Sequence, residues 1–152
     1  MKSAVIFDMD GTLANVSSIR HHLRRFDESK RRNIKDFNRF HAESVNVPAH
    51  SHVVNAAQMA HILGHDVLIV TARSHMWRNH TAWWLALNGV PSDALFMRNN
   101  NDKRADYEVK RDMLATIRKA WHIIHAWDDN PSIIQLWQEE NIPVSVVPGW
   151  DT

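Results

Sequence analysis

The apolar residues of this chain fall into two kinds of segment. Short, mostly apolar runs typical of buried strands lie at 4–7, 66–70, 94–97, 123–127 and 144–147. Longer segments with apolar residues three or four apart, the pattern of amphipathic helices, lie at 53–63, 77–87, 107–120 and 132–139. Strands that alternate with helices of this length predict an α/β fold. We expect a three-layer, Rossmann-like parallel sheet with helices on both faces.

Residues 15–51 interrupt this alternation with a polar, basic insertion. Between Arg20 and Arg39 the sequence has eight Lys and Arg against three acidic residues, a local charge of about +5. The whole chain is nearly neutral, with a formal net charge of +1. We expect one domain, 1–152, that carries a small, basic, helical cap at 15–51. Two interpretations of the cap stay open: its charges bind the phosphates of a nucleic-acid strand, or it is an amphipathic helix whose Phe37 and Phe40 pack inward.

The first strand ends in Asp8-Met9-Asp10-Gly11-Thr12. Side chains at positions i and i+2 of a strand lie on the same side, so Asp8 and Asp10 can converge on one point. Gly11 then permits a sharp turn. Open α/β sheets bind ligands at the carboxyl ends of their strands. The pattern therefore predicts a metal-assisted phosphoryl-transfer site.

Other polar residues follow later strands. Thr71 and Arg73 come after the second strand, Asp128 and Asp129 follow the fourth, and Lys110 lies in the helix that precedes that strand. Because the carboxyl ends of parallel strands share one edge, we expect these side chains to meet there.

This ordered set resembles the haloacid dehalogenase (HAD) superfamily of phosphohydrolases over essentially the whole chain. The first motif of that superfamily, Asp-x-Asp-Gly-Thr, is matched at 8–12 without deviation. The strand-end Ser or Thr is matched by Thr71, the basic residue by Lys110, and the acidic pair by Asp128 and Asp129.

The resemblance implies a phosphomonoesterase that depends on Mg²⁺. Asp8 would be the nucleophile that forms an aspartyl-phosphate, and Asp10 the general acid and base. Thr71 would donate a hydrogen bond to the phosphoryl group, and Lys110 would offset the charge of the carboxylates. The metal would be held by Asp8, by the backbone carbonyl of Asp10 and by Asp129, with Asp128 in the first or second coordination sphere.

A closer resemblance is to phage-type polynucleotide kinase 3′-phosphatase domains. It is carried by Val-Thr-Ala-Arg at 70–73, by Arg104-Ala-Asp106-Tyr-Glu-Val-Lys110, and by Asp128-Asp129 with Trp137. It implies that Arg73, Asp106 and Arg20 belong to the active site. Arg73 would clamp the phosphate; the alternative is a structural ion pair with Asp106, and the two roles are compatible. Gly11 and Thr12 would also contact phosphate. One departure is Asn130, where these domains often have Arg.

The expected function is removal of 3′-phosphates from nucleic-acid ends or nucleotides. The alternatives are a 5′(3′)-nucleotidase acting on free mononucleotides and, in another class, a non-catalytic nucleic-acid-binding module. The chain has no Gly-x-x-x-x-Gly-Lys-Ser/Thr motif, so any kinase activity would need a separate partner chain. A separate kinase or ligase chain is the expected protein partner. We expect a cytoplasmic protein, since the sequence has no cysteine, no signal peptide and no run of about 20 apolar residues.

The seven tryptophans are expected to serve mainly the core. Those in predicted elements are Trp83, Trp84, Trp121, Trp127 and Trp137. Trp77 with Arg78 is the exception, a pair just after the second strand that we expect to face substrate.

Overall fold

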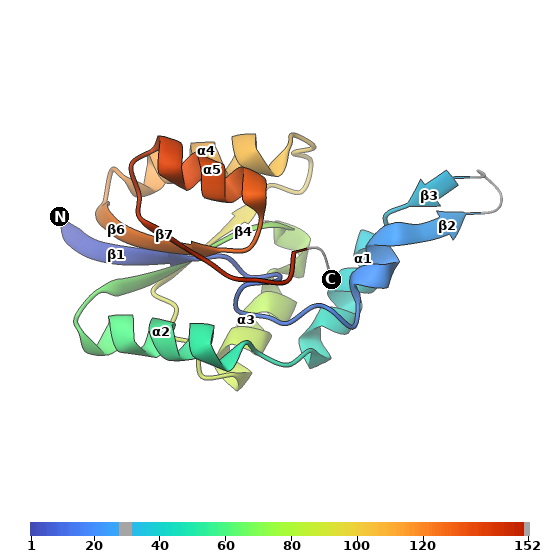
Figure 1. Cartoon of the computed structure of the whole chain (residues 1–152), viewed down its shortest axis with the longest axis horizontal. Coiled ribbons are helices and arrows are strands. Elements are labelled where there is room, and N and C mark those ends of the chain that lie inside the picture. Colours follow the sequence, from blue (N-terminus) through green and yellow to red (C-terminus); the bar gives the residue numbers. More distant parts are fainter. Residues whose placement is uncertain (28–31, 151–152) are drawn as a thin grey trace.

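The computed structural model describes residues 1–27 and 32–150, without the side chains of 25–34. Five strands form one sheet in the order β5-β4-β1-β6-β7, with every neighbouring pair parallel. They are β1 (Lys2–Phe7), β4 (Asp66–Ser74), β5 (Ala94–Arg98), β6 (Trp121–Asp128) and β7 (Val144–Val146). The predicted α/β parallel sheet is confirmed (Figure 1).

Helices cover both faces of this sheet (Figure 1). On one face lie α2 (Ser51–Ile62) and α3 (Arg78–Leu87), and on the other lie α4 (Asp106–Ile117) and α5 (Pro131–Glu139). Alternate residues of β1 serve the two layers: Phe7 packs in the cluster that contains Trp84, and Ile6 in the cluster that contains Trp137. Among the described residues, no helix has the length and apolar character to cross a membrane.

The first differences from the prediction lie in β4 and α3. Strand β4 continues past residue 70 to Ser74, so Thr71 and Arg73 are the last part of a strand and not a loop after it. In α3, Thr81, Trp84 and Leu85 are buried while Trp83 is 63% exposed. The prediction that Trp83 belongs to the core was wrong, because the helical repeat turns that position to solvent.

The insertion at 15–51 is only partly helical. It contains the 3-10 helices η1 (Arg20–Arg24) and η2 (Ser44–Asn46), the helix α1 (Phe37–Glu43), and the strands β2 (Arg25–Asp27) and β3 (Arg32–Ile34). The two strands pair antiparallel into a ribbon that projects away from the sheet (Figure 1). The prediction of a helical cap was wrong for the ribbon. The ribbon consists of two short strands in a run of charged residues, and these strands contain Phe26 and Ile34, both residue types that favour strands.

Helix α1 has one buried and one exposed phenylalanine. Phe40 is buried, as the amphipathic interpretation predicts, whereas Phe37 is 50% exposed. Of the basic residues counted in the insertion, Lys30 and Arg31 lie outside the described residues.

Candidate active site

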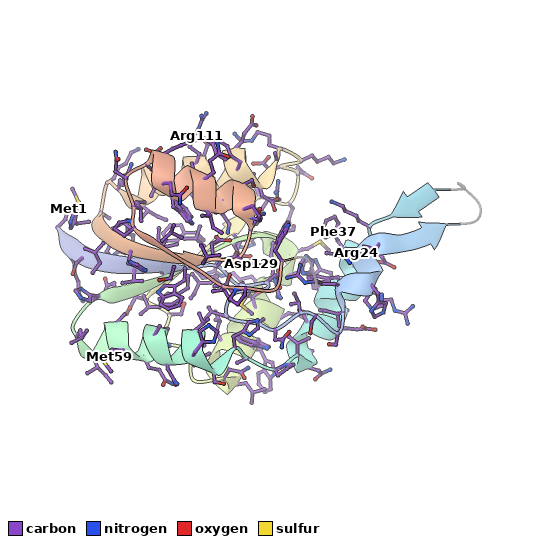
Figure 2. The ribbon with its side chains drawn as sticks, in the orientation of Figure 1. Met1, Arg24, Phe37, Met59, Arg111 and Asp129 are labelled. Carbon is purple, nitrogen blue, oxygen red and sulfur yellow. The ribbon has the colours of Figure 1, made fainter. Side chains whose placement is uncertain are left out.

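Three carboxylates meet at the carboxyl edge of the sheet. Asp8 follows β1 directly and is held beside β6 by its backbone N–H, which donates to the carbonyl of Trp127 (3.1 Å). Asp128 ends β6 and Asp129 follows it. All three are buried, and each offers an oxygen within 4.8 Å of the others. Figure 2 marks Asp129 at this edge, on the side from which the insertion projects.

Lys110 supplies the positive charge of this cluster. From the first half of α4 its buried Nζ donates to Asp8 Oδ1 (2.8 Å) and to Asp128 Oδ2 (3.1 Å). Burial opposes the charged form of the amine, but the charges of Asp128 and Asp8 outweigh it and raise the pKa of Lys110. Lys110 therefore stays protonated and holds one oxygen of the predicted nucleophile.

One lysine does not balance three buried carboxylates. Burial and the charge of Asp8 raise the pKa of Asp128 and of Asp129. The three acidic side chains carry more negative charge than Lys110 neutralises, and the metal ligands that they offer are all oxygen atoms. Both are properties of a Mg²⁺ site. The residues present fit the predicted metal.

The Gly-Thr pair of the first motif closes the cluster. Thr12 is buried, and its hydroxyl hydrogen-bonds to Asp8 Oδ2 (3.2 Å) and Asp129 Oδ1 (3.1 Å). Gly11 has φ 81°, and a Cβ there would lie 2.0 Å from Asp129 Oδ2. The N–H of Gly11 donates to Ala14 (2.8 Å). In this structure both residues therefore shape the carboxylate cluster, and their predicted contact with phosphate stays a prediction.

The carboxylate of Asp10 forms an ion pair with Arg73, which lies near the end of β4. The guanidinium of Arg73 donates to both carboxylate oxygens, at 2.9 Å and 2.5 Å, and its third nitrogen donates to Thr81 Oγ1 (3.0 Å). Burial opposes ionisation of Asp10, but the charge and hydrogen bonds of Arg73 lower its pKa. Thr71 lies beside this pair, and its Oγ1 accepts from the N–H of Arg73 (3.1 Å).

Arg20 also reaches the site, from the start of η1. Its Nη2 donates to Asp129 Oδ2 (3.3 Å), and its guanidinium carbon lies 5.6 Å from the ring centre of Trp150. The Nε of Arg20 is buried, and no hydrogen-bond acceptor for it occurs in the described part of the chain. A buried donor without a partner is costly, so it suits a ligand that brings an acceptor.

Asp106 is the predicted site residue that the structure places differently. It pairs with Arg98 (2.6 Å) and not with Arg73, so the proposed Arg73–Asp106 ion pair was wrong. Arg98 in turn donates to the carbonyl of Ala72 (2.9 Å). In the described part of the chain, Asp106 is thus linked to β4 through Arg98.

Two residues at the site have no signal in the sequence. Thr81 orients Arg73 from α3, and a single Thr in a helix looks like any other. His41 of α1 is buried close to Asp10 and Arg73, and burial with the charges of Arg73 and His80 lowers its pKa to about 4 against the opposing effect of Asp10. Among eleven histidines, nothing in the spacing distinguishes His41.

The sheet topology and this set of side chains define a phosphatase of the HAD superfamily. The sequence pattern of the phosphatase domain of polynucleotide kinase PNKP matches residues 2–149. The chain belongs to that family.

The similar proteins are larger than this chain. A protein of Autographa californica nuclear polyhedrosis virus, described as a bifunctional polynucleotide kinase/RNA ligase, is 32% identical over 83 residues, which are 52% of this chain and 12% of that protein. A chain from the structure of a Pnkp1/Rnl/Hen1 complex superposes with a TM-score of 0.80 at 23% identity and covers 100% of this chain, which spans 48% of it. The class C acid phosphatase of Bacillus anthracis gives a TM-score of 0.74 at 13% identity, over 99% of this chain and 68% of its own. These structures share the fold.

Proposed function

We propose that this protein removes 3′-phosphates from nucleic-acid ends, with Mg²⁺, through an aspartyl-phosphate on Asp8. The observation that carries the proposal is the buried contact of Asp8 with Lys110, Thr12 and the acidic pair at 128–129, in a chain that matches the PNKP phosphatase domain along its length. The family supports the reaction class, and the 3′-end is our inference from it.

Asp8 is arranged to attack phosphorus. Lys110 fixes Oδ1 and Thr12 hydrogen-bonds to Oδ2, so the carboxylate is held in one orientation before substrate arrives. Such preorganisation removes much of the entropic cost of the attack. Attack forms the bond between the Asp8 oxygen and phosphorus and breaks the bond between phosphorus and the leaving oxygen, and water then releases inorganic phosphate.

Asp10 would move the proton in both steps. To donate a proton to the leaving oxygen, Asp10 must first hold one, against the effect of Arg73 on its pKa, and it would then take a proton from the attacking water. In this structure both of its oxygens accept from Arg73. If Arg73 also clamps the phosphate, as we propose, it must exchange a bond to Asp10 for one to substrate. Thr71 and the buried Nε of Arg20 are further candidates for phosphoryl contacts.

The metal would be held by carboxylates of Asp8 and Asp129 and by the carbonyl of Asp10, with Asp128 beside them. When bound, Mg²⁺ would neutralise phosphate charge and so allow one anion to approach another.

A phosphate-release panel tests the substrate. We expect the highest kcat/KM for 3′-phosphorylated oligonucleotides over 5′-phosphorylated ones and over 3′- and 5′-mononucleotides. Activity on the oligonucleotide should fall steeply between 50 and 200 mM salt, because the basic insertion would contact several phosphates. A preference for mononucleotides with weak salt dependence would identify a nucleotidase. No release from any substrate would favour the non-catalytic binding module.

We also propose that this domain works alongside kinase or ligase domains. The relatives support this by their descriptions, a kinase/RNA ligase and Pnkp1/Rnl/Hen1 complexes, of whose chains this one spans only 44–48%. Stoichiometric co-purification with such a domain would support the proposal, and its absence under mild salt would count against a stable complex.

A further inference from the structure

An aromatic surface runs outward from Asp10 to solvent. It joins the insertion to the start of α3 and consists of Phe37, His41 and Trp77, to which we refer as the aromatic wall. The ring centres of His41 and Trp77 lie 5.6 Å apart, and those of Phe37 and His41 lie 6.1 Å apart with 20° between their planes. Figure 2 shows Phe37 on the insertion, on the side from which it meets the rest of the domain.

Exposure increases along the wall. His41 is only 7% exposed and lies near Asp10, Trp77 is half-buried, and Phe37 is 50% exposed. A half-exposed phenylalanine on a short helix gains little for folding, because much of its apolar area stays in water. The exposed half of the Phe37 side chain is therefore open to a ligand that already has its phosphate at the carboxylates.

The wall is bonded to the group that would hold the phosphate. Thr81 Oγ1 accepts from Arg73 and donates to the carbonyl of Trp77 (2.9 Å). The position of Trp77 is thus linked to that of the Arg73 guanidinium through one hydroxyl. A leaving group attached to a phosphate at Arg73 would extend along the wall.

His41 brings a buried polar atom to the wall. Its Nδ1 is buried and finds no hydrogen-bond partner among residues 1–27 and 32–150. Buried polar atoms in folded proteins are nearly always hydrogen-bonded. An unpaired nitrogen in an aromatic surface suits a flat ligand with polar edges, and a nucleobase has both properties.

We propose that the aromatic wall binds the nucleobase of the nucleotide that carries the phosphate. The base would stack on Phe37 and Trp77, and a polar atom of the nucleoside would reach His41 Nδ1. The proposal rests on the function proposed above and adds to it a subsite that reads the leaving nucleoside. Lys35, whose Nζ lies 5.9 Å from the ring centre of Phe37, would face the next phosphate.

The test pairs two substrates with two proteins. The substrates are a 3′-phosphorylated oligonucleotide and the same oligonucleotide with an abasic terminal nucleotide; the proteins are the wild type and Phe37→Ala. We expect the wild type to lose about 5- to 150-fold in kcat/KM when the base is removed, the range typical of stacking on an aromatic side chain. Phe37→Ala should lose a similar factor with the base present and almost nothing on the abasic substrate.

Trp83→Ala is the matched control, because Trp83 is an exposed aromatic residue outside the wall. It should leave both substrates unaffected. Trp77→Ala should behave like Phe37→Ala, and Phe37→Tyr should retain the discrimination. Equal losses on both substrates, or none, in Phe37→Ala would overturn the proposal.

The same experiment separates the two proposals. If the wild type cleaves both 3′-phosphorylated substrates equally well, the wall does not bind the base and the 3′-phosphatase proposal stands. If it cleaves neither but hydrolyses 5′-mononucleotides, the 3′-phosphatase proposal fails. In that case kcat/KM is compared for a nucleoside 5′-phosphate and for ribose 5-phosphate, which lacks the base. A higher value for the nucleoside 5′-phosphate that Phe37→Ala removes would show that the wall binds the base, and equal values would overturn the proposal.

Discussion

The carboxyl edge of the sheet and the basic insertion differ in how far apart in the chain their bonded residues are. At the edge, Thr12 bonds to Asp129 across 117 positions and Lys110 to Asp8 across 102. Within the insertion, His22 bonds to Glu43 (2.6 Å) across 21 positions, and Asp36 caps α1 by accepting from the N–H of Arg39 (3.0 Å). The edge is thus part of the global fold, whereas these contacts of the insertion are local, and Arg20 is the residue that ties the insertion to Asp129.

The two regions are expected to have different roles. The buried contacts of Lys110 and Thr12 with Asp8 connect distant parts of the chain, and they hold the predicted nucleophile in place. Apart from Arg20 and His41, the insertion can vary in sequence without disturbing that edge. We therefore expect chemistry at the edge and substrate choice at the insertion.

Removing the central charge of the edge should have the largest effect on stability. Lys110→Met leaves Asp8 and Asp128 buried without their cation, which we expect to lower the free energy of unfolding by about 3–5 kcal/mol. Urea denaturation without divalent metal measures it. Lys119→Met, an exposed position just beyond α4, is the control and should stay within about 0.5 kcal/mol. A loss under about 1 kcal/mol for Lys110→Met would show that the edge does not depend on this charge.

Metal should stabilise the same edge by a smaller amount. At a free Mg²⁺ concentration 100 times its Kd, the free energy of unfolding should rise by about 2.7 kcal/mol, because the folded state alone gathers the three carboxylates. Thermal unfolding in Mg²⁺ and in EDTA shows the rise. Asp129→Asn should remove most of it, while Asp112→Asn, at an exposed carboxylate on α4, should keep it. An equal rise in both variants would place the metal elsewhere.

The contact of the insertion with the edge should make the free energy of unfolding depend on pH through His41. The groups that act on His41 are Asp10, Arg73 and His80, and burial holds its pKa at about 4 against the ordinary 6.5. Since the folded protein then resists protonation more than the unfolded chain, stability present above pH 6.5 is lost as the pH falls toward 4. We expect a loss of about 2 kcal/mol between pH 7 and 5 that His41→Gln lacks.

Urea denaturation at several pH values measures this loss, and other titrating groups cancel in the comparison of the two proteins. His21→Gln, at an exposed neighbour in η1, should behave like the wild type. Parallel pH profiles for the wild type and His41→Gln would mean that His41 is not held against the edge as the structure shows.

The same contrast explains what the sequence could and could not predict. Strand periodicity and the rule for parallel sheets together predict that Asp8, Thr71, Lys110 and Asp129 share one edge, and the structure brings them there.

The rule predicts where the backbone of a residue lies, but it does not predict which group a long side chain contacts. Arg73 pairs with Asp10 and Asp106 pairs with Arg98, so the Arg73–Asp106 ion pair, the alternative considered for Arg73, was wrong.

The insertion was less predictable because no long-range rule applies to it. A polar, basic segment has weak periodicity, so its β-ribbon is not visible in the sequence. His41 and Thr81 depend on how the insertion and α3 dock against the sheet edge, which no local pattern encodes. The sequence thus predicts the residues expected to react better than the residues of the insertion and α3 that are expected to contact the rest of the substrate.

The most direct test of the account is to trap phosphate on Asp8. The protein is mixed with Mg²⁺ and an oligonucleotide bearing a radiolabelled 3′-phosphate, quenched in acid during turnover, and digested. We predict a hydroxylamine-labile label on the peptide that contains Asp8, present in the control Asp112→Asn and absent in Asp8→Asn, which should keep its fold and lose more than about 1,000-fold in kcat. Label on another residue, or turnover by Asp8→Asn near the wild-type rate, would contradict the account.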